Sequence, residues 1–192
     1  MKLLHIIKEG HNSLAFMKDF VADEAIDCDF IVPGRFHAAH NAREYDALAR
    51  EIASAPMGLE VPAHMVPRAE QHQELGTDVY HGGAVMEAHA SLDPGRYHQG
   101  LLGRVIAAGA TVIPRCRVTH LDPTSDGVDV VTANGKARAR DVIVATNGYT
   151  GTLTPWLRRR VIPIGSYIIA TEPLDASVMD RLFPTRRVVS DT

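Results

Sequence analysis

The chain has 192 residues, of which 45% are hydrophobic and 22% are charged. This balance is typical of a folded globular protein and excludes intrinsic disorder. The formal net charge is -3 and the basic residues are scattered, so neither nucleic acid nor an anionic membrane is an expected partner. Lys8 and Glu9 interrupt the apolar N-terminal run too early for a signal peptide, and no stretch approaches membrane-spanning length. We therefore expect a cytoplasmic protein.

The first part of the chain predicts a helix followed by short strands. Apolar positions at helical spacing indicate a helix over residues 3–25, broken near Gly10. No capping residue precedes Leu3, so we expect the natural beginning of this helix to lie upstream. Residues 26–39 alternate about a central Pro-Gly turn, which is typical of two short strands.

A second helix and two less regular segments follow. Asn41 precedes residues 42–53, which form one apolar helical face with Tyr45, Leu48, Ala49 and Ile52. Residues 56–78 contain several prolines and predict loops and short pieces. Residues 79–92 predict an extended segment in which Gly82-Gly83 forms a bend or bulge.

The strongest local signals begin at Asp93. Asp93 is a good N-cap and Pro94 fits the first position of a helix that Gly109 closes. The apolar stripe of this helix comprises Leu101, Leu102, Val105 and Ile106.

Short strands are predicted next, over residues 110–113 and 115–121 and in a hairpin that turns at Asn134-Gly135. Asp126-Gly127 turns the chain into the first strand of this hairpin. The hairpin should form a small separate sheet. Residues 142–146 are an unalternated apolar run, which predicts a buried strand of a mainly parallel sheet covered by the helix over 94–108.

The last segments predict a short helix over residues 153–160, a strand over 167–170 and a helix from Asp175 to Leu182. Residues 187–189 are strand-like. The abrupt stop after them leads us to expect an internal piece of a longer protein.

The cysteines and histidines give no metal or disulfide signature. Cys28 and Cys116 lie far apart, so two reduced thiols are favoured over one disulfide. His37 with His40, or His81 with His89 and His98, could suggest a metal site, but no HExxH is present. Surface or hydrogen-bonded histidines are the favoured interpretation, and we expect no metal.

The strand end Ala145-Thr146-Asn147-Gly148 is of the kind beside which ligands bind in doubly wound sheets, although many strands end in glycine for turn geometry alone. Three blocks are more specific: DPGRYHQGLLGRVIAAGATVIPRCRVTHLD, GVDVVTANGKARARDVIVATNGYTGTL and VIPIGSYIIATEPLD. In order and spacing they resemble the D-amino-acid-oxidase-like FAD-dependent oxidoreductases. The resemblance covers about residues 26–174 and is strongest to the gamma-glutamylputrescine oxidase branch, with glycine and sarcosine oxidases as broader relatives.

The resemblance implies FAD as the cofactor. It implies that the main chain at Val118 reads the adenine and that Ala145, Thr146, Asn147 and Gly148 pass close to the ADP moiety. It also implies that residues 163–171 lead into a substrate domain, in which Tyr167 is the candidate for contact with substrate or flavin. Tyr149 and Trp156 could line the flavin, but packing is at least as good an interpretation.

The resemblance is incomplete, because the family's GxGxxG turn, whose amides hold the pyrophosphate, is absent from the 192 residues. We therefore expect an α/β (mixed α+β) fold: an incomplete Rossmann-like FAD-binding half plus part of a mixed-sheet substrate domain. Residues 1–92 are assigned mostly to the substrate domain with a leading helix. Residues 93–160 are assigned to the FAD-binding part, and 161–192 to a truncated return to the substrate domain. We expect that this chain alone does not hold FAD tightly.

The predicted function is oxidation of the C–N bond of a small-molecule amine or amino acid by hydride transfer to flavin, which carries the chemistry. No general base is nominated. Arg35, Arg96 and Arg158 are equally good candidates for binding a substrate carboxylate. The alternative is a non-catalytic remnant or interaction protein that keeps the scaffold without flavin, and unpaired sheet edges favour self-association in either case.

Overall fold

The computed structural model describes residues 2–54 and 62–191, and the chain divides into two compact units. Unit 1 comprises Met1–Ala110 and Glu172–Thr192, and unit 2 comprises Thr111–Thr171. No helix in the described ranges combines the length and the apolar character that crossing a bilayer requires.

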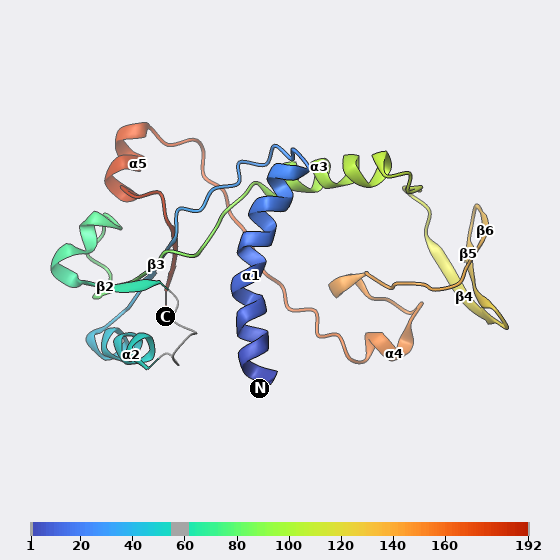
Figure 1. Ribbon diagram of the computed structural model, residues 1–192, viewed down its shortest axis with the longest axis horizontal. Coiled ribbons are helices and arrows are strands. Elements are labelled where there is room, and N and C mark those ends of the chain that lie inside the picture. The colour runs from blue at the N-terminus through green and yellow to red at the C-terminus, as the bar shows by residue number, and fades with distance from the viewer. Residues whose placement is uncertain (1, 55–61, 192) are drawn as a thin grey trace. The chain divides into compact units, whose positions relative to one another are not determined.

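Helices and short strands are interspersed along the chain (Figure 1). The helices are α1 (Lys2–Asp23), α2 (Ala42–Ala53), α3 (Pro94–Ala107), α4 (Pro155–Arg158) and α5 (Ala176–Leu182), with 3-10 turns η1 (Arg68–Gln73) and η2 (Asn147–Tyr149). The strands are β1 (Arg35–Ala38), β2 (Ala63–Pro67), β3 (Gly82–Met86), β4 (Val118–Thr124), β5 (Gly127–Thr132), β6 (Gly135–Ala139) and β7 (Val188–Asp191).

Local capping chemistry fixes the starts of α2 and α3. The Asn41 side chain accepts a hydrogen bond from the amide of Glu44 at 3.1 Å. The Asp93 carboxylate accepts from the amides of Gly95 and Arg96 at 2.8 and 3.0 Å, and Pro94 occupies the first turn of α3. Both helices are confirmed, because each cap satisfies amides that have no partner inside the helix.

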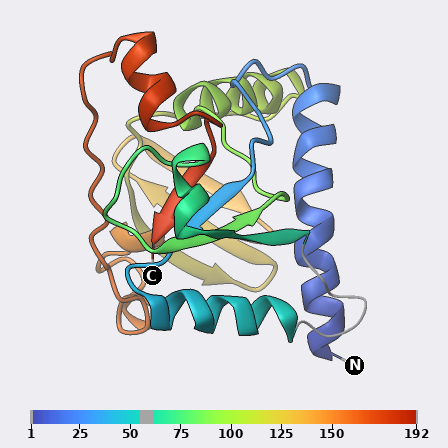
Figure 2. The ribbon, with the colours of Figure 1, turned by 90° about the vertical axis from the view of Figure 1, so that its left-hand side faces the viewer.

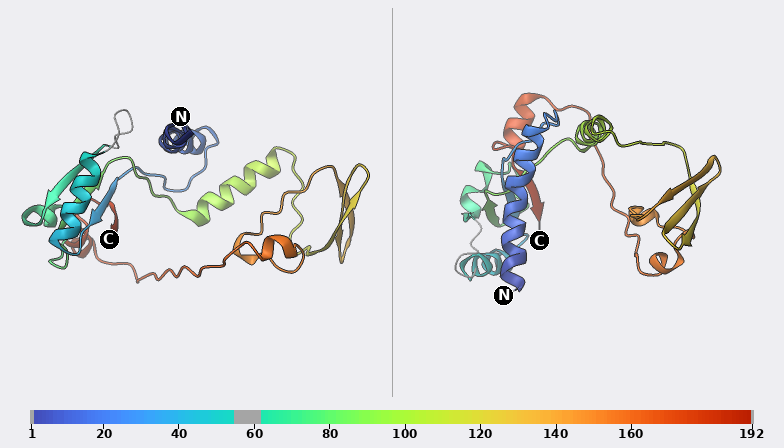
Figure 3. Two further views of the ribbon diagram at one scale, coloured as in Figure 1. Left: turned by 90° about the horizontal axis from the view of Figure 1, so that it is seen from below. Right: turned by 45° about the vertical axis from the view of Figure 1, so that its right-hand side comes forward.

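Helix α1 is continuous through Gly10, as the right-hand view of Figure 3 shows. The predicted break at this glycine is therefore wrong. A glycine inside a helix costs only about 1 kcal/mol relative to alanine, which the remaining turns of a 22-residue helix can offset.

Unit 1 is built on a four-stranded sheet in the order β2-β3-β1-β7 (Figure 2). Strands β1 and β7 are parallel, and the other pairs are antiparallel. Residues 26–39 form β1 and an isolated bridge between Ile31 and Ser91 rather than the predicted pair of strands. One face of the sheet carries the core cluster Phe36, Ala38, Val66, Leu75 and Val85.

A second apolar cluster joins the end of α1 to α3. Val21, Ile26 and Cys28 are buried there, and Leu101 of α3 packs against them. The rest of the predicted stripe is less buried than expected, since Val105 and Ile106 are 39% and 54% exposed.

Unit 2 contains the three-stranded antiparallel sheet β4-β5-β6. Asp126 lies in the turn between β4 and β5, and Asn134 in the turn between β5 and β6, where Thr132 pairs with Gly135. The predicted hairpin and its place in a separate small sheet are confirmed.

The prediction of a buried strand over residues 142–146 is wrong. This segment has no strand partner among the described residues, and Ile143 is 91% exposed. Residues 110–113 and 167–170 likewise form no strand. An apolar run becomes a strand only when other segments pair with its backbone and cover its faces, and no described segment does so here.

Asp129 ties β5 to β6 in this sheet. Its carboxylate accepts hydrogen bonds from Arg138 at 2.8 Å and from Lys136 at 3.1 Å. The bonds from Arg138 first, and from Lys136 second, lower the pKa of Asp129 from 3.8 to about 2.

The stability of the three-stranded sheet should therefore decrease in acid. A carboxyl group with a lowered pKa in the folded state stabilises fully above its ordinary pKa of 3.8, and this contribution is lost as the pH falls through about 2. Asp129→Asn should flatten the pH dependence in that window, as followed by amide NMR signals of β5 during thermal melts. Asp141→Asn, which removes an exposed carboxylate of the same unit, is the control. An unchanged pH dependence in Asp129→Asn would contradict the assignment.

Candidate functional site

The candidate site is a hollow in unit 2 with a volume of about 920 Å³. Residues 117–122, on and before β4, line one side of it. Residues 142–146, 149, 151–153 and 155 line the other side, and the last of these lies in the first turn of α4. Two segments that are distant in the sequence thus share one concave surface.

Some of the residues expected to bind the cofactor line this hollow, and others do not. Val118, Ala145 and Thr146 line it. Asn147 and Gly148 do not; they follow immediately in the turn η2. Tyr149 lines it, although packing was an equally good interpretation for this residue.

Tyr167 lies outside the hollow, with 93% of its surface exposed. It belongs to residues 161–171, which carry no helix or strand.

Strand β4 contributes residues 118–122 to the lining of this hollow. It is an edge strand of its sheet, so its outer edge has no strand partner among the described residues. The pairing is irregular between Val118 and His120, and Thr119 at this point donates its hydroxyl to the carbonyl of Val131 at 3.2 Å. An unpaired edge can present the donor and acceptor groups that a planar heterocycle requires.

The turn after residue 145 is held by threonine hydroxyls. The hydroxyls of Thr146 and Thr150 lie 2.8 Å apart, and Thr150 Oγ1 donates to the carbonyl of Asn147 at 2.7 Å. Asn147, not Gly148, has the left-handed backbone, with φ of 47°, which asparagine tolerates better than most residues. A Cβ atom at Gly148 would meet only the Pro163 side chain, at 3.9 Å, so the chain's own atoms do not require a glycine there.

The lining residues fit the adenosine end of FAD and do not fit its pyrophosphate. Threonine hydroxyls and the free edge of β4 suit the ribose and the base. Arg117 is the one Arg or Lys in the lining, and its side chain is exposed. Helix α4, with four residues, is too short to provide the row of free amides that holds a pyrophosphate.

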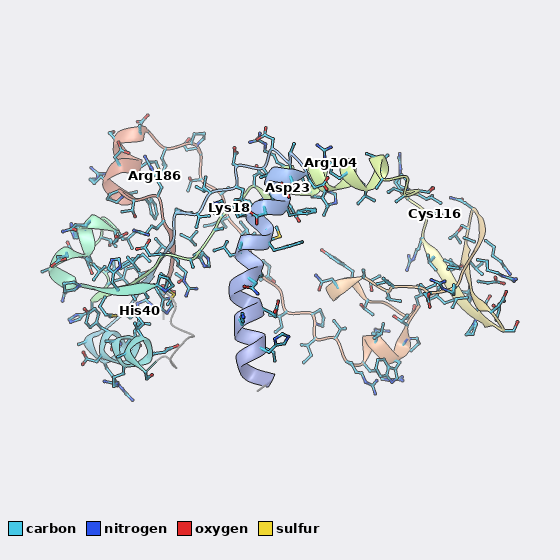
Figure 4. All side chains as sticks on the ribbon, in the orientation of Figure 1. Lys18, Asp23, His40, Arg104, Cys116 and Arg186 are labelled. Atoms are coloured by element: carbon cyan, nitrogen blue, oxygen red, sulfur yellow. The ribbon has the colours of Figure 1, made fainter. Side chains whose placement is uncertain are left out.

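A second group of polar contacts lies at the carboxyl ends of β1 and β7 in unit 1, near His40 in Figure 4. The Tyr80 hydroxyl donates to Asp191 at 3.0 Å, and His40 lies 3.4 Å from the same carboxylate. The hydrogen bond to Asp191 raises the pKa of Tyr80. His37 Nδ1 lies 2.7 Å from Ser190 Oγ.

These pairs could not be found by sequence analysis, because their members are as much as 153 residues apart.

The remaining sequence candidates occupy structural positions. Cys28 is buried and Cys116 is half-buried, and both are free thiols. Trp156 packs under the guanidinium of Arg160, which lies 3.8 Å from its ring centroid. No cluster of three or more His, Cys, Asp or Glu suited to a metal ion occurs within residues 2–54 and 62–191.

Comparison with known proteins gives one family. The family model described as FAD dependent oxidoreductase (DAO) matches residues 4–192. The chain is 32% identical over 123 residues to the probable oxidoreductase OrdL of Haemophilus influenzae, covering 62% of this chain and 28% of that protein. It is 28% identical to the gamma-glutamylputrescine oxidoreductase of Escherichia coli, covering 86% of this chain and 39% of that protein. The chain thus spans well under half the length of these curated relatives.

Solved structures show the same fold. Glycine oxidase from Geobacillus kaustophilus superposes with a TM-score of 0.68 at 19% identity, covering 76% of this chain and 41% of that structure. A variant of NikD, described as an unusual amino acid oxidase, superposes with a TM-score of 0.61 at 21% identity, covering 76% and 38%. At these identities the likeness is one of fold, a mixed α/β architecture.

Proposed function

Because this chain belongs to the FAD dependent oxidoreductase family, we propose that it is part of a flavoenzyme that oxidises the C–N bond of an amine or amino acid. The names of its relatives support this proposal: one is a gamma-glutamylputrescine oxidoreductase, and structural neighbours are a glycine oxidase and an amino acid oxidase. A cytoplasmic location is part of the same proposal.

The hollow in unit 2 is the observation that carries the assignment. It brings Val118 on β4 together with Ala145 and Thr146. The main chain at Val118 would hold the adenine, and residues 145–148 would lie along the ADP moiety. Tyr167 is the proposed contact with substrate or flavin. When bound, FAD supplies the redox chemistry by accepting a hydride from the substrate carbon.

The residues of this chain then bind and orient rather than react. The apolar side chains of Val142, Val144 and Leu153 in the lining would exclude water from the adenine. Exclusion of water strengthens the hydrogen bonds made to the adenine. In the proposed division, residues 93–160 belong to the FAD-binding part. Residues 1–92 and 161–192 belong to the substrate domain, where the sheet of unit 1 would face the substrate.

Titration of the ¹⁵N-labelled chain with AMP and with FAD at millimolar concentration tests the location. Both ligands should shift the amide signals of residues 118–120 and 145–149, because the adenosine half is common to them. The four-stranded sheet of unit 1 should not respond to AMP.

Shifts centred on residues 62–78 would contradict the proposed site. No saturable shift with either ligand would instead favour the alternative, a non-catalytic interaction protein.

A further inference from the structure

The segment between α4 and α5 exposes an uncharged apolar stretch. Residues 161–171 carry no helix or strand and contain no charged residue. In Figure 1 this segment is a plain trace that leads from α4 to α5. Ile162, Ile164 and Ile168 are 82%, 85% and 92% exposed. Single exposed apolar residues are ordinary, but several in one segment mark a surface that another segment covers.

The sequence of this segment suits a strand. Alternate side chains of an extended chain lie on the same face, so Ile162, Ile164 and Ile168 share one face and Tyr167 lies on the other. Isoleucine, which is β-branched, is enriched in strands. No described segment pairs with the backbone of residues 161–171. The segment therefore has the composition of a strand and lacks a neighbour.

Charged residues of opposite sign flank the segment in the sequence. Arg158-Arg159-Arg160 directly precede it, and Glu172 directly follows it. If two copies of the segment lie side by side in parallel, like charges meet at each end. If they lie antiparallel, the basic end of each copy meets the acidic end of the other. The charges thus favour antiparallel pairing of the segment with a second copy of itself.

One antiparallel register satisfies both the charges and the apolar face. It places Ser166 opposite Ser166 of the second copy, so that a two-fold axis passes between them. Ile164 then lies opposite Ile168 of the second copy, and Arg160 opposite its Glu172. Each of these pairs occurs twice, because the two copies exchange roles across the axis. Directly opposite side chains of this kind are the contacts that stabilise antiparallel strands.

Pro163 fits this register and limits it to two copies. Hydrogen-bonded and non-hydrogen-bonded pairs alternate along antiparallel strands. When the Ser166 pair is hydrogen-bonded, Pro163 falls at a non-hydrogen-bonded pair, so its missing N–H is not needed between the two copies. The outer edge of the strand then lacks a donor at Pro163, which disfavours the addition of a third copy.

Arg160 is held in place and keeps donors for such a contact. Its guanidinium lies 3.8 Å from the centroid of the Trp156 ring, and Nη1 donates to the Trp156 carbonyl at 3.0 Å. A guanidinium has five N–H groups in its plane, so a carboxylate can bind at its edge while the ring covers its face. The existing contacts reduce the side-chain entropy that a new ion pair would cost.

We propose that residues 160–172 form a two-stranded antiparallel contact between two copies of this chain, with the two-fold axis at Ser166. The dimer goes beyond the proposed function, and the face of the segment that carries Tyr167 stays open for the proposed contact with substrate or flavin. A two-stranded sheet is only marginally stable in water. The dimer should therefore dissociate on dilution.

Sedimentation velocity over a range of concentrations tests the dimer. The 192-residue chain should change from monomer to dimer as its concentration rises, without larger species. Ile164→Asp should weaken dimerisation at least tenfold, because it places a carboxylate opposite Ile168 of the second copy. Ile143→Asp is the matched control, because Ile143 is 91% exposed but lies outside the segment, and it should leave the dissociation constant within twofold.

Exchange of charges tests the register. Arg160→Glu and Glu172→Arg should each weaken dimerisation about threefold or more, because each places like charges opposite one another. The double variant should recover the original dissociation constant within about twofold. Arg159→Glu changes the net charge equally but lies on the other face of the extended segment, so it should have less than a twofold effect.

Ser166→Cys tests the two-fold axis directly, because position 166 faces itself. Mild oxidation should crosslink this variant into a covalent dimer much faster than the original chain, whose thiols are Cys28 and Cys116. A chain that stays monomeric, or that forms species without a size limit, overturns the proposal. Equal losses in Ile164→Asp and Ile143→Asp, or no recovery in the charge-exchanged double variant, also overturn it. Positions 159, 160, 164, 166 and 172 are exposed, so these variants should fold as the original chain does, which circular dichroism checks.

Discussion

The 192-residue chain should bind FAD with a dissociation constant in the high-micromolar range or weaker. The pyrophosphate carries two negative charges, which related folds neutralise with free amides at a helix N-terminus. Each charge-assisted bond of that kind contributes about 1.5–3 kcal/mol. The sequence contains no GxGxxG turn, so two or three such bonds are lost, which weakens binding by several powers of ten at about 1.4 kcal/mol per tenfold. Arg117 cannot replace them, because an exposed ion pair contributes about 1 kcal/mol or less.

Quenching of flavin fluorescence measures the dissociation constant of FAD. Displacement of FAD by adenosine, the matched ligand, measures the dissociation constant of adenosine. If the chain binds only the adenosine half of FAD, the dissociation constants of adenosine and FAD should agree within about tenfold. A submicromolar dissociation constant for FAD, or peroxide production that depends on added amine, would show that the chain already holds everything the cofactor needs.

Arg187→Met is expected to destabilise unit 1 by about 3 kcal/mol. The Arg187 and Glu74 side chains are 17% and 11% exposed, and Glu74 also accepts from Thr185 at 2.9 Å. Removing the cation leaves a buried carboxylate unpaired, for which about 3–5 kcal/mol is typical. The lower figure applies because some solvent reaches the pair. Denaturant unfolding followed by circular dichroism gives the free energy.

Arg186→Met is the neighbouring control (Figure 4). Arg186 is exposed and pairs with the exposed Asp180, so its loss should change stability by about 1 kcal/mol or less. The double variant Glu74→Gln with Arg187→Met should recover part of the loss, because no unpaired charge then remains. Equal effects of the two single arginine substitutions would contradict a structural role for the buried pair.

Local chemistry explains which elements could be predicted from the sequence. The caps at Asn41 and Asp93 and the hairpin at Asn134-Gly135 each depend on residues within a few positions of one another. The prediction of a strand over residues 142–146 is wrong because an apolar composition indicates only that a strand would be buried on both faces. It does not indicate whether other segments of the chain pair with that strand. The sheet of unit 1 depends on such neighbours throughout.

Some residues of the candidate sites are expected from the sequence, and others are found only in the structure. The roles of Val118 and residues 145–148 rest on resemblance and stay predictions, although Val118, Ala145 and Thr146 share one hollow. The contacts of Asp191 with Tyr80 and His40 could not be predicted from the sequence, because these residues are far apart in the chain. The contacts follow from the pairing of β1 with β7 and have no signature among neighbouring residues.

The parallel pairing of β1 with β7 constrains the order of folding during translation. His37 and Ser190 are 153 residues apart, and the whole of unit 2 is synthesised between them. At typical rates of about 5–20 residues per second, β1 waits on the order of ten seconds for its neighbour. During that time its open edge could pair with another nascent chain. Ribosome-associated chaperones would therefore act on β1 before β7 emerges, and slow codons between the two strands would lengthen the exposure.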